Sequence, residues 1–261
     1  MDKKRQSILL LILSVLLLVV ISTRVSPKQP GSINDPKTTE PNLEAVEPTP
    51  EATPPQDEPE PQKPIREILP ELSLSDWNLK LVNNTYILAK DFAPDVSKIQ
   101  DEQYFDSRAV EYLNAMLVAA EEAGYTVCVR TAYRPYSTQA YLFNGRASQI
   151  QWGTTMTLME AEMEARKIVA YPGTSEHQLG LCVDLMDSPD SSMTVETAEE
   201  LPVIQWLQEH CAEYGFILRY PKEKQERTGW YEPWHFRYVG ESAARYIMEN
   251  DLCLEEFVEQ F

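Results

Sequence analysis

A proline-rich stretch near the N-terminus limits which part of the chain can fold. Residues 27–64 hold eleven of the nineteen prolines, eight acidic residues, three lysines and no aromatic residue. Such a segment cannot bury enough apolar surface to offset the entropy that it would lose on ordering. We therefore expect residues 25–65 to form a disordered linker and residues 66–261 to form one folded domain. A length of about 190 residues is ample for a sizeable core.

The chain begins with a segment that is typical of a membrane anchor. Basic residues at positions 3–5 precede an apolar run from Ile8 to Ile21, and the next charge is Arg24. A helix needs about 20 residues to cross a bilayer, with a lower limit of about 17, so this segment is just long enough. A cleaved signal peptide, whose apolar region typically has about 7–15 residues, is the alternative. We expect residues 1–24 to be an uncleaved signal anchor that leaves the rest of the chain outside the membrane.

The balance of charge excludes one class of partner. The 41 acidic and 23 basic residues give the chain a formal net charge of −18 at pH 7. Nucleic-acid phosphates would repel such a chain, so we expect no nucleic-acid partner.

Helices and strands are mixed in order along residues 66–261. Apolar periodicity and end signals predict the type of each element. The predicted helices cover residues 109–123, 137–143 with a cap at Ser137, 158–170 and 204–214, and two more start at Glu241 and Leu254. The predicted strands cover residues 79–82 and 86–88, which form a short hairpin, and residues 125–129, 181–185, 216–219 and 235–238. Because these elements do not alternate regularly as β-α-β units, their order indicates an α+β fold.

Two motifs carry most of the residues that can do chemistry. The first is Ser-Glu-His-Gln-Leu-Gly-Leu-Cys-Val-Asp at residues 175–184, and the second is Glu-Pro-Trp-His at residues 232–235. Together they supply two imidazoles and a carboxylate, from His177, His235 and Asp184. Two histidines and one aspartate make a three-ligand set for a catalytic zinc, which keeps its fourth position open for water. The sequence therefore predicts a zinc hydrolase.

A glutamate three residues before His235 completes the predicted site. Pro233 argues against a helix at this point, so we expect Glu232 to lie where a loop enters a strand. Beside the metal, Glu232 can act as a general base that takes a proton from the zinc-bound water. The remaining histidine, His210, lies among polar residues in a predicted helix and is expected to face solvent.

Further motifs lie upstream of these two. They are Ala-Tyr-Arg at residues 132–134, followed by Gln139, and Trp-Asn-Leu-Lys-Leu-Val-Asn at residues 77–83. Together the motifs resemble the zinc D-alanyl-D-alanine carboxypeptidases of the VanY type, over roughly residues 72–261. The chain departs from the family pattern at Cys182, where members usually carry a small residue. It also departs at Pro135, because a serine often follows the motif arginine in the family.

The resemblance implies both a fold and a metal site. Members of the family have a small antiparallel sheet flanked by helices, so we expect a single zinc-peptidase domain of this kind. Matching positions imply that His177, Asp184 and His235 bind the zinc and that Glu232 is catalytic.

A carboxypeptidase also has to recognise the free carboxylate at the end of its substrate. The resemblance implies that Arg134, Gln139 and Ser175 serve this purpose. A guanidinium suits the task because it binds a carboxylate bidentately, and the amide and hydroxyl groups can add neutral hydrogen bonds.

The sequence therefore predicts a membrane-held enzyme that acts on the cell-wall side. The expected reaction is zinc-dependent hydrolysis of the C-terminal D-amino acid from peptidoglycan stem peptides of the D-Ala-D-Ala type. Two alternatives stay open: an L,D-carboxypeptidase that acts on tetrapeptide stems, and a catalytically silent, zinc-containing wall-binding module. Glu232 favours an enzyme, because a binding module has no need of a general base.

The expected location on the cell-wall side, outside the reducing cytoplasm, also permits disulfides among the four cysteines. Four cysteines allow three pairings, and we expect Cys211 to pair with Cys253 because both lie in the C-terminal part of the chain. Cys128 and Cys182 are expected to be small buried thiols in strands. In a regular strand Cys182 shares a face with Asp184, but the ligand set is complete without it, so we do not expect a zinc–thiolate bond.

Overall fold

The computed structural model describes residues 64–261 of the chain. The predicted signal anchor (residues 1–24) and nearly all of the predicted linker (residues 25–65) lie outside the described residues. Within residues 64–261, no helix combines the length and the apolar character that crossing a membrane requires.

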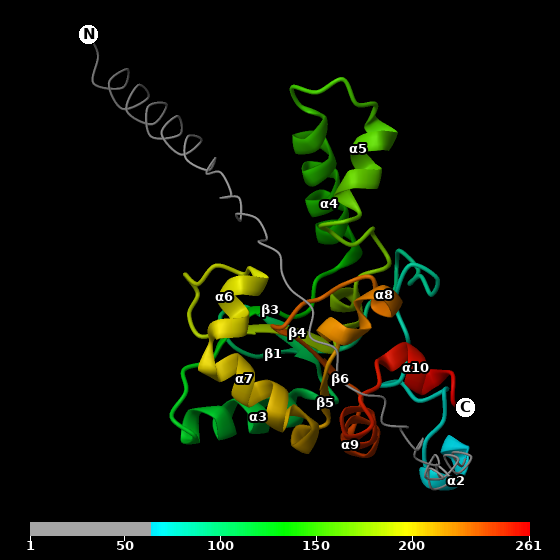
Figure 1. Cartoon of the computed structure of the whole chain (residues 1–261), viewed down its shortest axis with the longest axis vertical. Coiled ribbons are helices and arrows are strands. Elements are labelled where there is room, and N and C mark those ends of the chain that lie inside the picture. Colours follow the sequence, from blue (N-terminus) through cyan, green and yellow to red (C-terminus); the bar gives the residue numbers. More distant parts are fainter. Residues whose placement is uncertain (1–63) are drawn as a thin grey trace, which may run out of the picture. The chain divides into compact units, whose positions relative to one another are not determined.

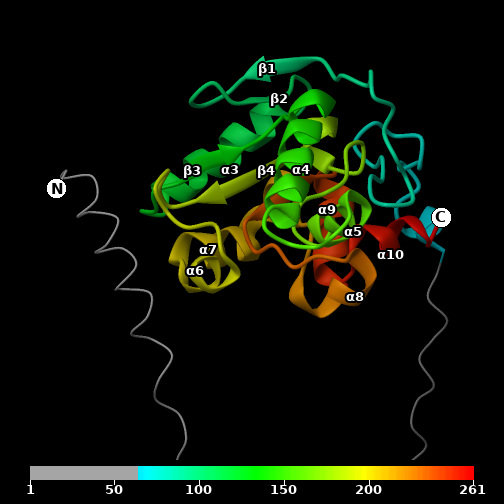
Figure 2. The same cartoon turned by 90° about the horizontal axis from the view of Figure 1, so that it is seen from above.

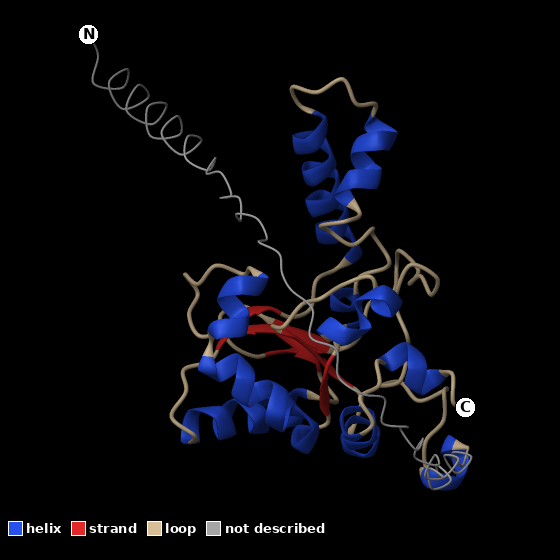
Figure 3. Cartoon of the chain, in the orientation of Figure 1, coloured by secondary structure: helices blue, strands red, loops and turns tan. Residues whose placement is uncertain are grey.

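A four-stranded antiparallel sheet lies at the centre of the described domain (Figure 3). Its strand order is β3-β4-β6-β5, with β3 at Cys128–Thr131, β4 at Cys182–Met186, β5 at Phe216–Leu218 and β6 at His235–Tyr238. A separate two-stranded sheet pairs β1 (Val96–Lys98) with β2 (Tyr104–Asp106) at one edge of the domain (Figure 2). Small antiparallel sheets surrounded by helices confirm the predicted α+β class.

Helices surround the sheet and connect its strands (Figure 1). The longer ones are α3 (Val110–Glu122), α4 (Tyr136–Gln151), α5 (Leu158–Ala165), α7 (Pro202–His210) and α9 (Glu241–Glu249); the shorter ones are α2 (Ile65–Ile68), α6 (Val195–Glu200), α8 (Gln225–Thr228) and α10 (Leu254–Val258). Three short 3₁₀ turns, η1 (Glu176–Leu179), η2 (Cys211–Tyr214) and η3 (Lys222–Lys224), directly precede β4, β5 and α8.

One face of the four-stranded sheet forms the main hydrophobic core. Side chains alternate between the two faces of a strand, and Val183, Leu185, Phe216 and Phe236 all point to the same one. These four side chains are fully buried. They belong to one hydrophobic cluster with residues of α3 and α7, which lie below the sheet in Figure 1.

The opposite face of β4 and β6 is polar, although it is also buried. In the antiparallel register, Cys182 lies opposite Arg237 and Asp184 lies opposite His235. A shift of the register by one residue would move the apolar side chains out of the core. The apolar alternation of the two strands therefore also determines which polar side chains meet on the other face.

A second hydrophobic cluster covers β5 from the polar side. Ile217 points away from the main core and packs with residues of α9 and α10, which include Ile247 and Phe257. Ile65 of α2 belongs to the same cluster and is fully buried. The folded domain therefore includes α2 as well as the C-terminal helices.

Helices α4 and α5 pack against each other and extend away from the sheet (Figure 1). We call residues 136–165 the α4–α5 arm. Phe143, Ala147 and Ala165 are buried between its helices as a small core of their own. Helix α5 begins with a capping box, in which Thr157 and Glu160 each accept a hydrogen bond from the backbone N–H of the other. The arm therefore has its own source of stability.

Several predicted elements are confirmed. The strands predicted at residues 181–185, 216–219 and 235–238 correspond to β4, β5 and β6 with shifts of at most one residue, and the helices predicted to start at Glu241 and Leu254 are α9 and α10. Helix α3 buries the predicted apolar face, with Leu113 and Met116 fully buried.

Two predictions of local structure are wrong. Residues 79–82 and 86–88 form no hairpin beyond the turn at Asn83, because their backbone groups bond elsewhere: the Leu88 N–H donates to the Gly173 carbonyl and the Lys80 carbonyl accepts from Arg237. The helix predicted at residues 137–143 has no cap at Ser137, and it continues to Gln151 as α4 because it packs along α5.

All four cysteines are free thiols, so the predicted Cys211–Cys253 disulfide is wrong. Cys211 is buried in the main core, whereas the side chain of Cys253 caps the start of α10. Burial raises the pKa of Cys211 to about 12 and that of Cys253 to about 11, so both thiols stay protonated at neutral pH.

We expect Leu113→Ala to lower the free energy of unfolding by about 2–5 kcal/mol, because it removes buried apolar surface and leaves a cavity under the sheet. Val118→Ala is the matched control on the same helix, since Val118 is 51% exposed and its truncation should change stability by less than about 0.5 kcal/mol. Urea unfolding measures both effects. Equal effects of the two substitutions would contradict the assignment of the buried face.

Candidate active site

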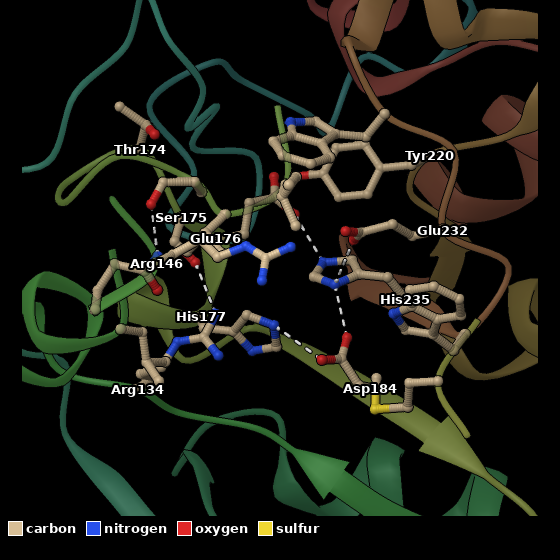
Figure 4. A pocket seen from close by; sticks show the side chains of 18 of the residues that line it. Arg134, Arg146, Thr174, Ser175, Glu176, His177, Asp184, Tyr220, Glu232 and His235 are labelled. Atoms are coloured by element: carbon tan, nitrogen blue, oxygen red, sulfur yellow. Dashed lines mark hydrogen bonds and ion pairs between the residues drawn. The ribbon is translucent and has the colours of Figure 1, made fainter. Parts of the chain in front are cut away.

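A cavity of about 560 Å³ opens on the polar face of β4 and β6. Its lining includes all of the residues that the sequence analysis selected, which are Arg134, Gln139, Ser175, His177, Asp184, Glu232 and His235. In Figure 4 the side chains of His177, Asp184, Glu232 and His235 point toward one another. Arg146, which the sequence analysis did not select, also lines the cavity.

His177 is held in place by two hydrogen bonds with the backbone of the segment that follows β3. It lies in η1, which ends at Gly180 with a φ of +76°, a conformation that favours glycine. The Nδ1–H group of His177 donates to the carbonyl oxygen of Ala132 at 2.7 Å. The carbonyl oxygen of His177 accepts a hydrogen bond from the backbone N–H of Arg134 at 3.0 Å. This tautomer leaves the Nε2 lone pair free to bind a metal.

Potential metal ligands converge at the bottom of the cavity. His177 Nε2 lies 3.2 Å from Asp184 Oδ2, and His235 Nδ1 lies 2.9 Å from Asp184 Oδ1. A tetrahedral zinc holds its ligand atoms at about 2.0–2.2 Å, so these three side chains lie close enough together to bind one ion. Burial raises the pKa of Asp184, but the two imidazoles outweigh burial and hold the pKa well below its ordinary value.

Cys182 lies close to both imidazoles, at a position that the sequence analysis left open. Its Sγ and one ring nitrogen of each of His177 and His235 all lie within 4.8 Å of one another, a spacing at which these atoms could hold a metal. Burial lowers the pKa of His177, but Cys182 and Asp184 outweigh burial and raise it to about 9. Cys182 is fully buried and does not line the cavity, so its thiol is not open to the cavity.

Glu232 lies in the loop that enters β6, as predicted. Its carbonyl oxygen accepts a hydrogen bond from the backbone N–H of His235 at 3.1 Å, which makes a tight turn around Pro233. Glu232 Oε2 lies 3.6 Å from His235 Nδ1, and the side chain is 26% exposed. Burial raises the pKa of Glu232 by more than the imidazole of His235 lowers it. A raised pKa suits a carboxylate that exchanges protons near neutral pH.

Hydrogen-bond donors lie on another wall of the same cavity. Arg134 Nη2 donates to Ser175 Oγ at 3.4 Å, and Arg134 Nε is buried without a partner. Gln139 Nε2 donates to the carbonyl oxygen of Ala170 at 2.6 Å, which leaves its second N–H free. This wall can therefore recognise an anion.

Glu176, which the sequence analysis did not select, is buried beside His235. Its Oε1 accepts hydrogen bonds from Arg219 Nε at 2.8 Å and from Arg237 Nη1 at 2.6 Å. Its Oε2 has no hydrogen-bond partner and lies 3.7 Å from His235 Nε2, which also has none. Burial raises the pKa of Glu176, but the two guanidinium groups outweigh burial and hold the pKa well below its ordinary value. The carboxylate can therefore orient the His235 ring while Nδ1 faces the other metal ligands.

The two arginines extend this contact to distant parts of the chain. Arg219 also pairs with Glu255 of α10 through two hydrogen bonds of 2.9 and 2.7 Å. Arg237 Nη2 donates to two carbonyl oxygens in residues 78–80. One signal in the sequence points to this network, because Arg237 shares a strand face with His235.

Comparison with known proteins agrees with the site. The family model VanY, described as D-alanyl-D-alanine carboxypeptidase, matches residues 102–241. A D-alanyl-D-alanine carboxypeptidase of Enterococcus faecalis is 36% identical over 184 residues, which are 70% of this chain and 66% of that protein. A solved structure of a mutant vancomycin-resistance D,D-pentapeptidase VanY in complex with Zn(II) is 35% identical, has a TM-score of 0.61, and covers 70% of this chain and 99% of its own. The structure of the LdcB LD-carboxypeptidase is 36% identical, has a TM-score of 0.60, and covers 70% of this chain and 87% of its own.

The α+β fold, the buried cluster of metal-binding side chains and these similarities define a zinc carboxypeptidase. The chain belongs to the VanY family of D-alanyl-D-alanine carboxypeptidases. The predictions of family, enzyme class and zinc cofactor are therefore confirmed.

We expect Glu176→Gln to destabilise the protein and to weaken zinc binding. The substitution keeps the shape of the side chain but leaves two buried guanidinium groups without their shared anion, and breaking a buried ion pair costs about 3–5 kcal/mol. Loss of an outer-shell partner typically lowers metal affinity by about 10- to 100-fold. Urea unfolding and competition with a zinc chelator measure the two effects.

Glu213→Gln is the control for this experiment, because it removes a carboxylate from the exposed His210 pair and not from the site. It should change stability by less than about 0.5 kcal/mol and leave zinc affinity unchanged. If Glu176→Gln behaves in the same way, the role assigned to Glu176 is wrong.

Proposed function

We propose that this protein hydrolyses the bond before the C-terminal D-amino acid of peptidoglycan stem peptides that end in D-Ala-D-Ala. The observation that carries the proposal is that one cavity contains both an anion-recognising wall and a cluster of metal-binding side chains. When the terminal carboxylate of a peptide binds Arg134, the last peptide bond of that peptide lies next to the metal-binding side chains. The relatives' names support the choice of a D-Ala-D-Ala end.

We propose that His177, Asp184 and His235 bind the zinc. His177 offers Nε2, because its Nδ1–H is engaged with a backbone carbonyl, and His235 offers Nδ1, because this nitrogen faces Asp184. When bound, the ion supplies a Lewis acid and lowers the pKa of a water molecule. Asp184 lines the cavity and Cys182 does not, which favours Asp184 as the third ligand.

Glu232 is proposed as the general base. Its Oε2 lies 3.6 Å from His235 Nδ1, so the carboxylate borders the ligand atoms and is exposed to the cavity. It takes a proton from water during attack on the scissile carbonyl and then passes a proton to the leaving amine. Its raised pKa makes the carboxylate a stronger base for the first step.

Arg134 is proposed to bind the terminal carboxylate, with Gln139 and Ser175 as neutral donors. The Nη2 contact of Arg134 with Ser175 directs the guanidinium toward the cavity, and its unpartnered Nε is a further donor. Two parallel N–H···O bonds from one guanidinium would position the substrate and would distinguish a free C-terminus from an amidated one.

Residues 1–24 are proposed to hold the enzyme at the membrane, with residues 25–65 as a spacer that lets the catalytic domain reach the bacterial cell wall. The support for this location comes from the apolar run and from the proline content of the sequence. Expression of the full-length chain, followed by membrane fractionation, tests it. Recovery in the soluble fraction alone would contradict the anchor.

An L,D-carboxypeptidase that acts on tetrapeptide stems is the second candidate, and the similarity to the LdcB LD-carboxypeptidase favours it. Mass spectrometry of muropeptides after incubation with the zinc-loaded full-length protein separates the candidates. Loss of D-alanine from pentapeptides supports the first, and loss from tetrapeptides alone supports the second. Binding without any loss would overturn both and would favour a silent wall-binding module.

We expect His177→Ala to lose the zinc that the wild-type protein holds at one ion per chain. The substitution removes the Nε2 ligand and leaves only Asp184 and His235 of the three proposed protein ligands. Metal analysis of the purified full-length protein measures the loss. His210→Ala is the control, because His210 lies outside the cavity and pairs with Glu213. Full zinc occupancy in His177→Ala would refute the ligand assignment.

We expect Glu232→Ala to keep its zinc and its fold but to lose turnover by about 10²- to 10⁴-fold or more, the range for a positioned general base. The variant should still bind stem peptides, because the substrate-binding residues Arg134, Gln139 and Ser175 are unchanged. Zinc content, peptide affinity and release of D-alanine are measured on one preparation. Activity near that of the wild type would mean that another group moves the proton.

A further inference from the structure

The α4–α5 arm contributes one wall of the cavity. The α4 residues that line the cavity include Leu142, Arg146 and Gln149, and those of the segment after α5 include Ile168 and Val169. The three α4 positions follow the helical repeat of three to four residues, so they share one face. That face looks into the cavity, whereas the adjacent face, with Phe143 and Ala147 one residue further along the helix, packs on α5.

Arg146 reaches into the cavity without an anionic partner of its own. In Figure 4 its guanidinium points into the pocket that holds His177 and Glu176. Its Nη1 donates to Gln149 Oε1 at 3.3 Å, while Nε is buried and has no hydrogen-bond partner. Among the residues that the structure describes, no carboxylate lies within salt-bridge distance of it. A buried donor without a partner is costly, so the substrate is the natural source of the missing acceptor.

The buried arginines that stabilise the fold, unlike Arg146, have carboxylate partners. Arg219 and Arg237, which are fully buried, each form a salt bridge with Glu176, at 2.8 and 2.6 Å. The chain has 41 acidic residues against 23 basic ones, so carboxylates outnumber the cationic side chains. An arginine that lines the cavity and stays without one is therefore suited to bind an external anion.

Arg146 and Arg134 lie at different places along the cavity. Arg134 precedes α4 and contacts Ser175, which is two residues before a proposed zinc ligand. From the start of α4 at Tyr136 to Arg146 the helix rises about 15 Å, at 1.5 Å per residue. Helical side chains lean toward the N-terminus, so Arg146 reaches back into the cavity from farther along the arm. Two guanidinium groups that enter from such separate positions suit two different anions.

On the basis of the proposed function, we propose that Arg146 binds a second carboxylate of the substrate, on a side chain upstream of the scissile bond. The preferred substrate class is then a stem peptide with a diaminodicarboxylic acid before the D-Ala-D-Ala end. A peptide with lysine there is disfavoured, because a guanidinium binds carboxylate but repels an ammonium group. Leu142 and Ile168, which line the same wall, suit the aliphatic part of such a side chain.

The test uses three acetylated peptides that end in D-Ala-D-Ala and differ only in the preceding residue. This residue is aminopimelic acid, its side-chain amide, or lysine, and kcat/KM is measured with the zinc-loaded full-length protein. A hydrogen-bonded ion pair predicts that the wild type prefers the carboxylate peptide to the amide peptide by about 10- to 100-fold. The lysine peptide should be the poorest of the three.

Substitutions assign the preference to Arg146. In Arg146→Met the ratio between carboxylate and amide peptides should fall to about 1, and in Arg146→Glu the lysine peptide should become better than the carboxylate peptide. Arg166→Met removes the same charge just beyond α5, where Arg166 stacks on Tyr171 at 4.1 Å and does not line the cavity. This control should keep the wild-type ratio. Circular dichroism and zinc content check that each variant is folded.

The outcomes separate this inference from the proposed function. If the wild type releases D-alanine from none of the peptides, the proposed function itself fails. If it hydrolyses all three with equal kcat/KM, the function stands and the role of Arg146 is wrong. A wild-type ratio that persists in Arg146→Met, or that Arg166→Met also abolishes, overturns the inference as well. The wild-type preference needs no variant, so equal rates would decide against the inference even if a variant misfolds.

Discussion

The active site depends on one buried carboxylate, that of Glu176. It directly precedes His177 in the chain, it is shared by Arg219 and Arg237, and it faces the outer nitrogen of His235. Without this anion, Arg237 would be buried with no carboxylate partner and Arg219 would keep only Glu255 of α10, and breaking a buried ion pair costs about 3–5 kcal/mol. The same side chain therefore makes burial of β5 and β6 possible and positions an imidazole, which couples the stability of the sheet to the metal site.

Much of the fold was predictable because it depends on local pattern. The strand at residues 235–238 and the helix that starts at Glu241 follow from short-range alternation and periodicity, and both occur as predicted. The missing hairpin at residues 79–82 and the full length of α4 were not predictable in this way. In the first case the backbone groups of the two segments bond to distant residues, Leu88 to Gly173 and Lys80 to Arg237, and in the second case packing on α5 sustains a helix of weak periodicity.

The site residues that belong to the sequence motifs could be predicted. Contacts between segments that are far apart in the sequence could not. His177 and Asp184 share one motif, and strand pairing brings His235 opposite Asp184, so their convergence follows from residue types and pairing. No spacing in the sequence connects Glu176 to Arg219, and none indicates that Arg146 turns into the cavity. These contacts arise only when a helix, a turn and separate strands have packed, which is a property of the tertiary structure.

The separate small core of the α4–α5 arm has a consequence for how such enzymes diversify. Effects of substitutions at independent positions are close to additive, and the core of the arm is separate from the main core, so changes on the cavity face of α4 leave the stability of the main core nearly unchanged. Selection can therefore vary residues such as Arg146 while the hydrolytic machinery is inherited without change. When the chemistry of the cell wall changes in a bacterial lineage, substitutions in this one exposed helix would be enough to change the substrate preference of the enzyme.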